Sequence, residues 1–137
     1  MIFSSYNSIF DVGNISGTGT ATLTITGALT TDAGSYDVVI SSPTGSCSQI
    51  ISNPAALTVN QKSADPTSAN ATTPTICVGG STTLNLVGGG GGTGETIHWY
   101  SDALLTNSVG IGNALAVNPT VTTTYYVRAE GDCNITA

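Results

Sequence analysis

Two short stretches of the chain decide its predicted fold: residues 23–25 read Leu-Thr-Ile, and residues 32–40 read Asp-Ala-Gly-Ser-Tyr-Asp-Val-Val-Ile. Apolar and polar residues alternate along both stretches, which is typical of strands with one buried face. The small residues that precede Tyr36 predict a tight corner between the two strands. The alternation places Tyr36, Val38 and Ile40 on the inward face, so we expect Tyr36 in the structural core.

A tyrosine at the end of such a corner is a feature of immunoglobulin-like (Ig-like) sandwiches, where its hydroxyl donates a hydrogen bond back to the backbone of the corner. The stretch therefore resembles the corner between strands E and F of an Ig-like domain. Only residues 1–22 precede the first of its two strands. We therefore expect this first domain to lack its N-terminal strands.

The composition favours an all-β chain and argues against several partners. Charged residues make up only 7% of the sequence, Thr, Ser, Gly and Asn fill the polar positions, and no long amphipathic helix pattern is present. The formal net charge is −6, with Lys62 and Arg128 as the only basic side chains. Two basic side chains cannot neutralise a phosphate backbone, so we expect no nucleic-acid partner. The sequence also has no apolar run of about eighteen residues or more, so we expect no membrane insertion.

The chain is predicted to hold two tandem Ig-like β-sandwiches, both incomplete. Residues 1–60 form the C-terminal part of the first domain, and residues 61–65 form a polar linker. Residues 66–137 form the second domain, in which short alternating segments separated by Gly- and Pro-containing turns predict further strands. The sequence ends shortly after Cys133, so we expect the second domain to lack its final strand.

Five short motifs in the second half resemble one known family. They are Ile-Cys-Val-Gly-Gly at 76–80, Trp-Tyr-Ser-Asp at 99–102, Gly-Ile-Gly at 110–112, Pro-Thr-Val-Thr-Thr-Thr-Tyr-Tyr-Val at 119–127 and Gly-Asp-Cys at 131–133. This pattern is similar to Ig-like repeats of large secreted or cell-surface proteins of Bacteroidota, often associated with gliding motility, adhesion and type IX secretion. Residues 14–59 resemble a neighbouring repeat type of such proteins. The resemblance implies an exported, multi-repeat, non-enzymatic protein.

The three cysteines suggest an oxidising, extracytoplasmic setting. Cys77, Trp99 and Cys133 follow the order of the Ig disulfide and its packing tryptophan, so the resemblance implies a core Trp99 and a Cys77–Cys133 bridge of non-standard placement. Closing that loop would stabilise the fold by roughly 4 kcal/mol on the chain-entropy model. Cys47 occupies the matching position of the first repeat. It is a free thiol, half of a disulfide whose partner belongs to the missing strands, or a bond to another chain.

Catalytic, metal-binding and cofactor-binding residues are not expected. Glu95, His98 and Asp102 flank Trp99, but alternation puts His98 on the face opposite to Trp99, and we expect no metal site there. Residues 88–92 are glycines without the Lys-Ser/Thr that follows a phosphate-binding loop. The chain has one histidine and no nucleophile elbow, so we expect no enzyme.

The aromatic residues of the second half give the only hint of a ligand. We expect Tyr126 to join Tyr36 and Trp99 as core residues, and Tyr100 and Tyr125 to face outward as a possible ligand face. Three functions remain open. The first, which we favour, is a structural spacer or stalk segment of an extracellular or cell-surface adhesin. The second is a self-assembling filament subunit that pairs its strands with neighbouring Ig-like domains or identical subunits. The third is an accessory module that binds surface glycans.

Overall fold

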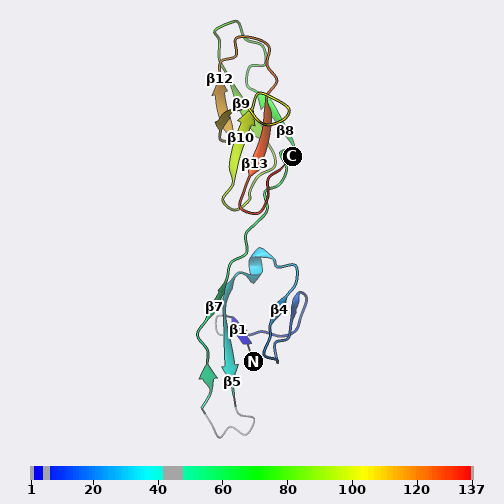
Figure 1. Cartoon of the computed structure of the whole chain (residues 1–137), viewed down its shortest axis with the longest axis vertical. Coiled ribbons are helices and arrows are strands. Elements are labelled where there is room, and N and C mark those ends of the chain that lie inside the picture. The colour runs from blue at the N-terminus through cyan, green and yellow to red at the C-terminus, as the bar shows by residue number, and fades with distance from the viewer. Residues whose placement is uncertain (1, 5–6, 42–47, 137) are drawn as a thin grey trace. The chain divides into compact units, whose positions relative to one another are not determined.

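The computed structural model describes residues 2–4, 7–41 and 48–136. Over these residues the regular elements are strands, apart from one 3-10 turn, η1 (Thr30–Asp32), so the all-β prediction is confirmed. None of the described segments forms a helix of the length and apolarity that a bilayer crossing requires. The chain divides into two compact units, Met1–Val59 (unit 1) and Asn60–Ala137 (unit 2), shown in Figure 1.

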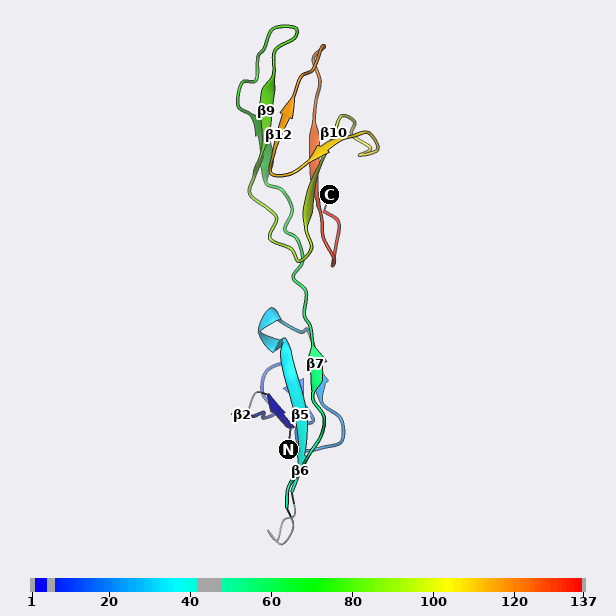
Figure 2. The same cartoon turned by 90° about the vertical axis from the view of Figure 1, so that its left-hand side faces the viewer.

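Unit 2 is a sandwich of two three-stranded antiparallel sheets, which Figure 2 shows as two layers. The β9 sheet has the order β12-β9-β8, and the β10 sheet has the order β11-β10-β13. Its strands are short and separated by turns, as the sequence predicted. They are β8 (Ser68–Ala71), β9 (Thr82–Val87), β10 (Thr96–Tyr100), β11 (Ser108–Ile111), β12 (Ala114–Val117) and β13 (Tyr126–Glu130).

The core of unit 2 lies between these two sheets. The β9 sheet contributes Leu84, and the β10 sheet contributes Ile97, Trp99 and Ala129. Trp99 lies where the sequence placed it, and it is the largest fully buried side chain, only 1% exposed. Its indole Nε1 donates to the backbone oxygen of Gly112 at 2.8 Å. The polar atom of the ring therefore has a partner, and the ring can be buried without an unsatisfied N–H group.

Unit 1 is built around the long strand β5 (Gly34–Ile40). One edge of β5 pairs with β1, and the other pairs with β6 and β7. The remaining strands are short: β1 (Ile2–Ser4), β2 (Asn7–Ser8), β3 (Ile15–Ser16), β4 (Thr24–Ile25), β6 (Ile50–Ile51) and β7 (Ala55–Leu57). β2 extends the sheet beyond β1, while β3 and β4 form a separate pair.

The predicted tyrosine corner is present between β4 and β5. The Tyr36 hydroxyl donates to the backbone oxygen of Asp32 at 2.5 Å, and Tyr36 is partly buried. The Asp32 carboxylate accepts hydrogen bonds from the Leu29 N–H at 2.8 Å and from the Asn14 amide at 2.6 Å. The Asp32 carboxylate thus ties the corner to the residue before β3, and the Asp32 backbone oxygen ties it to β5.

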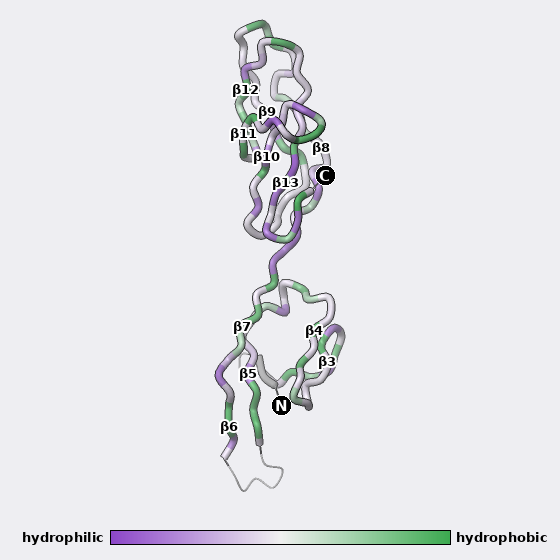
Figure 3. Tube along the Cα trace, viewed as in Figure 1, coloured by the Kyte–Doolittle hydropathy of each residue, from purple (hydrophilic) through white to green (hydrophobic). Residues whose placement is uncertain are grey.

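Comparison of the two units shows what unit 1 lacks. β5 with its neighbours β1 and β7 corresponds to β13 with β10 and the chain end, but unit 1 has no counterpart of β8 and β9 among its described residues. Val39 is the one buried hydrophobic residue of its described part. Val38 and Ile40 are exposed, so their predicted inward position is wrong, because no second sheet covers that face. Figure 3 shows apolar sequence along β5 and β6.

Residues 61–65 are part of unit 2 and do not form the free linker that their polarity suggested. Thr93 donates its backbone N–H to the Gln61 oxygen at 3.0 Å. Ala64 and Gly90 exchange two backbone hydrogen bonds, and the Asn134 side chain bonds both the N–H and the carbonyl of Ser63 at 2.8 and 3.0 Å. Polar residues here satisfy backbone groups of the sandwich, so their polarity is no sign of a linker.

The chain after β13 also turns back and bridges the edge of β13, where we predicted that the final strand is missing. Ile135 bridges Glu130, and the N–H of Thr136 donates to the Ala129 oxygen at 2.9 Å. The Thr136 hydroxyl accepts the Ala129 N–H at 2.8 Å, and both residues are buried. The Thr136 hydroxyl thus supplies the acceptor for a buried backbone N–H at the edge of β13.

Replacing Thr136 by Val should destabilise unit 2 by about 1–3 kcal/mol, because the fully buried Ala129 N–H would lose its acceptor. Urea unfolding followed by the fluorescence of Trp99, the only tryptophan, reports on unit 2 alone. The matched control is Thr124→Val on an exposed threonine, for which we expect a change within about 0.5 kcal/mol. Equal effects of the two substitutions would contradict the assigned hydrogen bond.

Replacing Tyr36 by Phe should destabilise unit 1 by about 1 kcal/mol, since it removes the hydroxyl that closes the corner. Hydrogen exchange of the β5 amides measures this change within unit 1. Tyr126→Phe, on an exposed ring of unit 2, serves as the control and should leave β5 exchange unchanged. Unaltered protection of β5 in Tyr36→Phe would show that the corner bond does not hold the strand.

Candidate functional site

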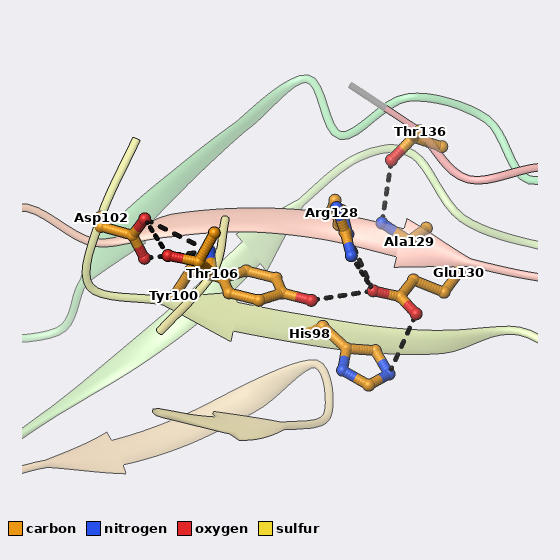
Figure 4. Close-up of polar contacts among 8 residues, drawn as sticks. All are labelled: His98, Tyr100, Asp102, Thr106, Arg128, Ala129, Glu130 and Thr136. Atoms are coloured by element: carbon orange, nitrogen blue, oxygen red, sulfur yellow. Dashed lines mark hydrogen bonds and ion pairs between the residues drawn. The ribbon is translucent and has the colours of Figure 1, made fainter. Parts of the chain in front are cut away.

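The outer face of the β10 sheet is the surface on which the sequence placed a possible ligand site. β10 and β13 pair in the register His98↔Arg128 and Tyr100↔Tyr126. Since directly opposed residues share a face, these side chains and Glu130 lie on the side opposite to Trp99. Figure 4 shows four of them in contact, and we call His98, Tyr100, Arg128 and Glu130 the outer-face cluster.

Glu130 is the centre of the outer-face cluster. Its Oε1 accepts the Tyr100 hydroxyl at 2.8 Å and the Arg128 Nε–H at 2.8 Å, and lies 2.7 Å from Arg128 Nη2. Its Oε2 lies 3.9 Å from Nε2 of His98. Arg128 also places its guanidinium carbon 4.9 Å from the centroid of the Tyr100 ring, and His98 stacks on that ring with centroids 6.4 Å apart.

These contacts leave the predicted ligand face closed. Tyr100 does lie on the outer side, but Arg128 and His98 cover its ring so that only 5% of the residue is exposed. Tyr125 is partly buried and packs against the core, so its predicted outward position is wrong. Tyr126 is 36% exposed and shares the face of Tyr100, so its predicted place in the core is also wrong. The pairing of Tyr126 with Tyr100 sets this register, and a shift of one residue exchanges the two faces.

Glu130 and Arg128 form an ion pair at the centre of the cluster. The hydrogen bond from Tyr100, followed by those from Arg128, lowers the pKa of Glu130, and the hydrogen bond to Glu130 raises the pKa of Arg128. Burial, reinforced by the Glu130 carboxylate, raises the pKa of the Tyr100 hydroxyl. A general base requires a carboxyl pKa shifted towards neutrality, which is the opposite direction. The cluster is therefore suited to holding two strands together and not to proton transfer.

The N–H donors of the glycine-rich loop bond a side chain of the same chain. The N–H groups of Gly91 and Gly92 donate to the Glu95 carboxylate at 3.3 and 3.0 Å, so these donors already have a partner. Asp102 accepts from the Thr106 N–H and from the Asn107 N–H at 2.6 Å and closes its own turn. Within residues 2–4, 7–41 and 48–136, no three His, Cys, Asp or Glu side chains gather as metal ligands would.

The predicted Cys77–Cys133 bridge is not formed, and both thiols are free and exposed. Cys77 lies in the turn between β8 and β9, on the side where Ala71 pairs with Leu84. Cys133 lies in the turn after β13, whose Asp132 N–H bonds the Thr93 oxygen in the β9–β10 connection. The two turns are at opposite ends of unit 2, as Figures 1 and 2 show. Cys47 lies outside the described residues.

An uncharged groove that sequence reasoning missed opens at the Cys77 end of unit 2. Its volume is about 600 Å³, and two connections line it, the β8–β9 turn and the segment between β12 and β13. Leu84 and Tyr125 contribute from the core side. The lining side chains include no charged residue. Two segments about 45 residues apart form the groove, a proximity that alternation within single strands does not reveal.

The stability of unit 2 should fall as the pH drops below the ordinary Glu130 pKa of 4.5. A carboxyl whose pKa is lowered by folding stabilises the protein above its unfolded value, and this contribution is lost as pH falls through the lowered value. Glu130→Gln should therefore make unfolding free energy less dependent on pH between about 5 and 3. The comparison is made in a His98→Gln background, which removes the imidazole facing Glu130. Parallel pH profiles would contradict the role of Glu130.

The comparisons with known proteins agree with this architecture. No curated protein matches the chain. Residues 64–137, more than half of the chain and nearly all of unit 2, match the family described as "Ig-like domain CHU_C associated". The match supports the resemblance to Ig-like domains of Bacteroidota-type proteins that the motifs around Cys77 and Trp99 indicated. The chain therefore belongs to the CHU_C-associated family of Ig-like domains.

Proposed function

We propose that this chain is a non-enzymatic structural module, a spacer or stalk segment of an extracellular or cell-surface adhesin. One observation carries the proposal: the polar side chains of the outer face bond each other around Glu130 and leave no open set of ligand-binding groups there. A surface of this kind stabilises its own strands. A self-stabilised surface suits a domain whose role is to provide length and rigidity.

The same geometry argues against an enzyme. The single histidine, His98, faces Glu130, whose pKa shift opposes a role as a general base. The acidic residues on either side of Trp99 in the sequence, Glu95 and Asp102, bond backbone groups of their own loops. An extracytoplasmic location is supported by the family resemblance and by the sparsely charged, Thr-rich composition, which keeps strands soluble without many ion pairs.

A filament subunit is the second candidate, and unit 1 provides the observation that favours it. Val38, Ile40 and Ile50 are exposed on one face of β5 and β6, and the described strands of unit 1 include no counterpart of β8 and β9. Strands supplied by an identical subunit would cover this apolar face through main-chain pairing. Strand pairing of this kind persists in the presence of a reductant. A disulfide link between chains does not, so the two can be told apart.

Tyr100 and Tyr125 do not offer the exposed rings that a glycan-binding role would need. Tyr100 is covered by Arg128 and His98, and Tyr125 packs on the core. Sugar rings stack on exposed aromatic faces, and Tyr126 alone retains partial exposure on the outer face. We therefore do not propose a glycan-binding role.

The spacer proposal predicts a monomeric chain that binds no polysaccharide under reducing conditions. Sedimentation equilibrium over a hundredfold concentration range, with reductant present, should fit one 13.7 kDa species. Affinity electrophoresis in gels containing cellulose or chitin derivatives should show no retardation. Concentration-dependent association in reductant would support the filament instead. Retardation abolished by Tyr126→Ala but not by the matched substitution Leu104→Ala, on an exposed loop side chain, would restore glycan binding.

A further inference from the structure

The same pair of hydrogen bonds joins β13 and β5 to the segments that follow them. In unit 2, the Thr136 hydroxyl accepts the Ala129 N–H at 2.8 Å, and the Thr136 N–H donates to the Ala129 oxygen at 2.9 Å. In unit 1, the Ser52 hydroxyl accepts the Val38 N–H and the Ser52 N–H donates to the Val38 oxygen, both at 2.9 Å. The isoleucine before each of these hydroxyl residues pairs with the strand residue that follows Val38 or Ala129. Val38 of β5 and Ala129 of β13 are therefore equivalent positions.

Unit 1 shows how the rest of this strand edge is paired. Beyond the hydroxyl contact the chain continues as β7, in which Ala55 pairs with Tyr36 and Leu57 pairs with Gly34. Tyr36 and Gly34 lie two and four residues before Val38. The main-chain groups of alternate residues point to the same edge of an antiparallel strand, so β7 pairs with the edge to which the Val38 groups point.

The equivalent edge of β13 is open. Counting back from Ala129, the positions that correspond to Tyr36 and Gly34 are Val127 and Tyr125. The N–H and carbonyl of Val127 point to the same edge as those of Ala129, away from β10. No residue in the described part of the chain pairs with Val127 on that side. We call the side of Tyr125 and Val127 that faces away from β10 the open edge.

The open edge borders the core and the uncharged groove. Tyr125 and Val127 are partly buried and pack against the core of unit 2. Tyr125 also lines the groove, together with Leu84 from β9. A strand that paired with the open edge as β7 pairs with β5 would place its leucine opposite Tyr125. Because directly opposed residues share a face, this leucine would lie beside the groove, on the core side of the sheet.

The open edge lies away from the end at which the chain enters unit 2. Residues 61–65 bond Gly90, Thr93 and the Asn134 side chain, beside the turn after β13. In Figure 2 the chain turns back at that end and then runs beside β13. The groove opens at the other end, where the connection between β12 and β13 lines it. Residues 61–65 therefore do not cover the open edge.

We propose that the open edge accepts one extended strand of a partner protein, which runs antiparallel to β13 and has the side-chain pattern of β7, two small residues followed by an aliphatic one. Two observations select this partner. β7 fills the equivalent edge in unit 1, and the groove beside Tyr125 has no charged side chain that would pair with a charged strand. A second copy does not supply the strand, because its β7 is already paired with its own β5. The inference goes beyond the spacer role, since it gives the module a site that holds another protein.

The test uses the full-length chain, isotopically labelled and kept in reductant, and a peptide with the sequence of residues 54–59, acetylated and amidated at its ends. A few main-chain hydrogen bonds and one buried leucine are expected to give a dissociation constant of about 1 mM. Amide chemical shifts should change at Val127 and at Thr123, which lines the groove. With peptide at about five times the dissociation constant, the Val127 amide should exchange with solvent at least about threefold more slowly.

Two peptides that differ only in the place of one methyl group test the main-chain pairing. Ala55 lies opposite Tyr36 with its N–H towards the paired edge, while the N–H of Ala56 points away. N-methylation at the position of Ala55 should weaken binding at least about tenfold, and N-methylation at that of Ala56 should leave it within about twofold. Leu57→Asp in the peptide should also weaken binding at least about tenfold, because it would bring a charge to the uncharged groove.

A variant of the protein tests the edge itself. Val127→Pro removes the N–H of the open edge and should abolish peptide binding. Proline is tolerated in an edge strand where its missing N–H faces away from the neighbouring strand, and Trp99 fluorescence checks that unit 2 is folded. If this variant does not fold, the two N-methyl peptides decide the question with the unmodified protein.

Three results would overturn the proposal. They are equal weakening by the two N-methyl groups, chemical-shift changes confined to β5, β6 or β8, or no binding at peptide concentrations up to about 10 mM. None of them bears on the spacer role, which predicts monomers that bind no polysaccharide. Association of the chain with itself in reductant would contradict the spacer role and leave the comparison of the two N-methyl peptides unaffected.

Discussion

Burial of Trp99 between two sheets is the constraint on which unit 2 depends. An indole ring can be buried there only if its N–H finds an acceptor, and the Gly112 oxygen supplies it. Gly112 adopts φ +109°, a conformation that favours glycine, in the turn that leads from β11 to β12. Its N–H bonds the Ile97 oxygen of the β10 sheet, while the next residue, Asn113, accepts the Leu86 N–H of the β9 sheet. The turn that satisfies the tryptophan therefore also fastens the two sheets together.

The outer-face cluster follows from the same strand. Because β10 turns Ile97 and Trp99 inward, it must turn His98 and Tyr100 outward. An exposed tyrosine ring would have offered a ligand surface, but Arg128, one of only two basic side chains in the chain, covers it and is neutralised by Glu130. The polar groups on that face therefore bond each other, both within β13 and between β13 and β10.

The sequence predicted those features that depend on neighbours in the chain. Alternation and turn residues were enough for the strands, for the corner closed by Tyr36 and for the buried Trp99. The exposure of Tyr126 could not be predicted, because two adjacent tyrosines fit either register and only pairing with Tyr100 decides between them. The cover over Tyr100 depends in part on Arg128, which comes from another strand, β13. Residues 61–65 looked like a linker because their polarity serves hydrogen bonds to distant loops.

The cysteines show most clearly how order along a chain differs from position in space. Cys, Trp and Cys occur in the order of an Ig disulfide, and the resemblance therefore implied a bridge across the core. In an antiparallel sandwich, however, each connection lies at one end or the other, and the β8–β9 turn and the turn after β13 lie at different ends. Counting the strands between two cysteines decides whether a bridge can form within the domain. Cys77 and Cys133 fail this test, and each is a free, exposed thiol in its own turn.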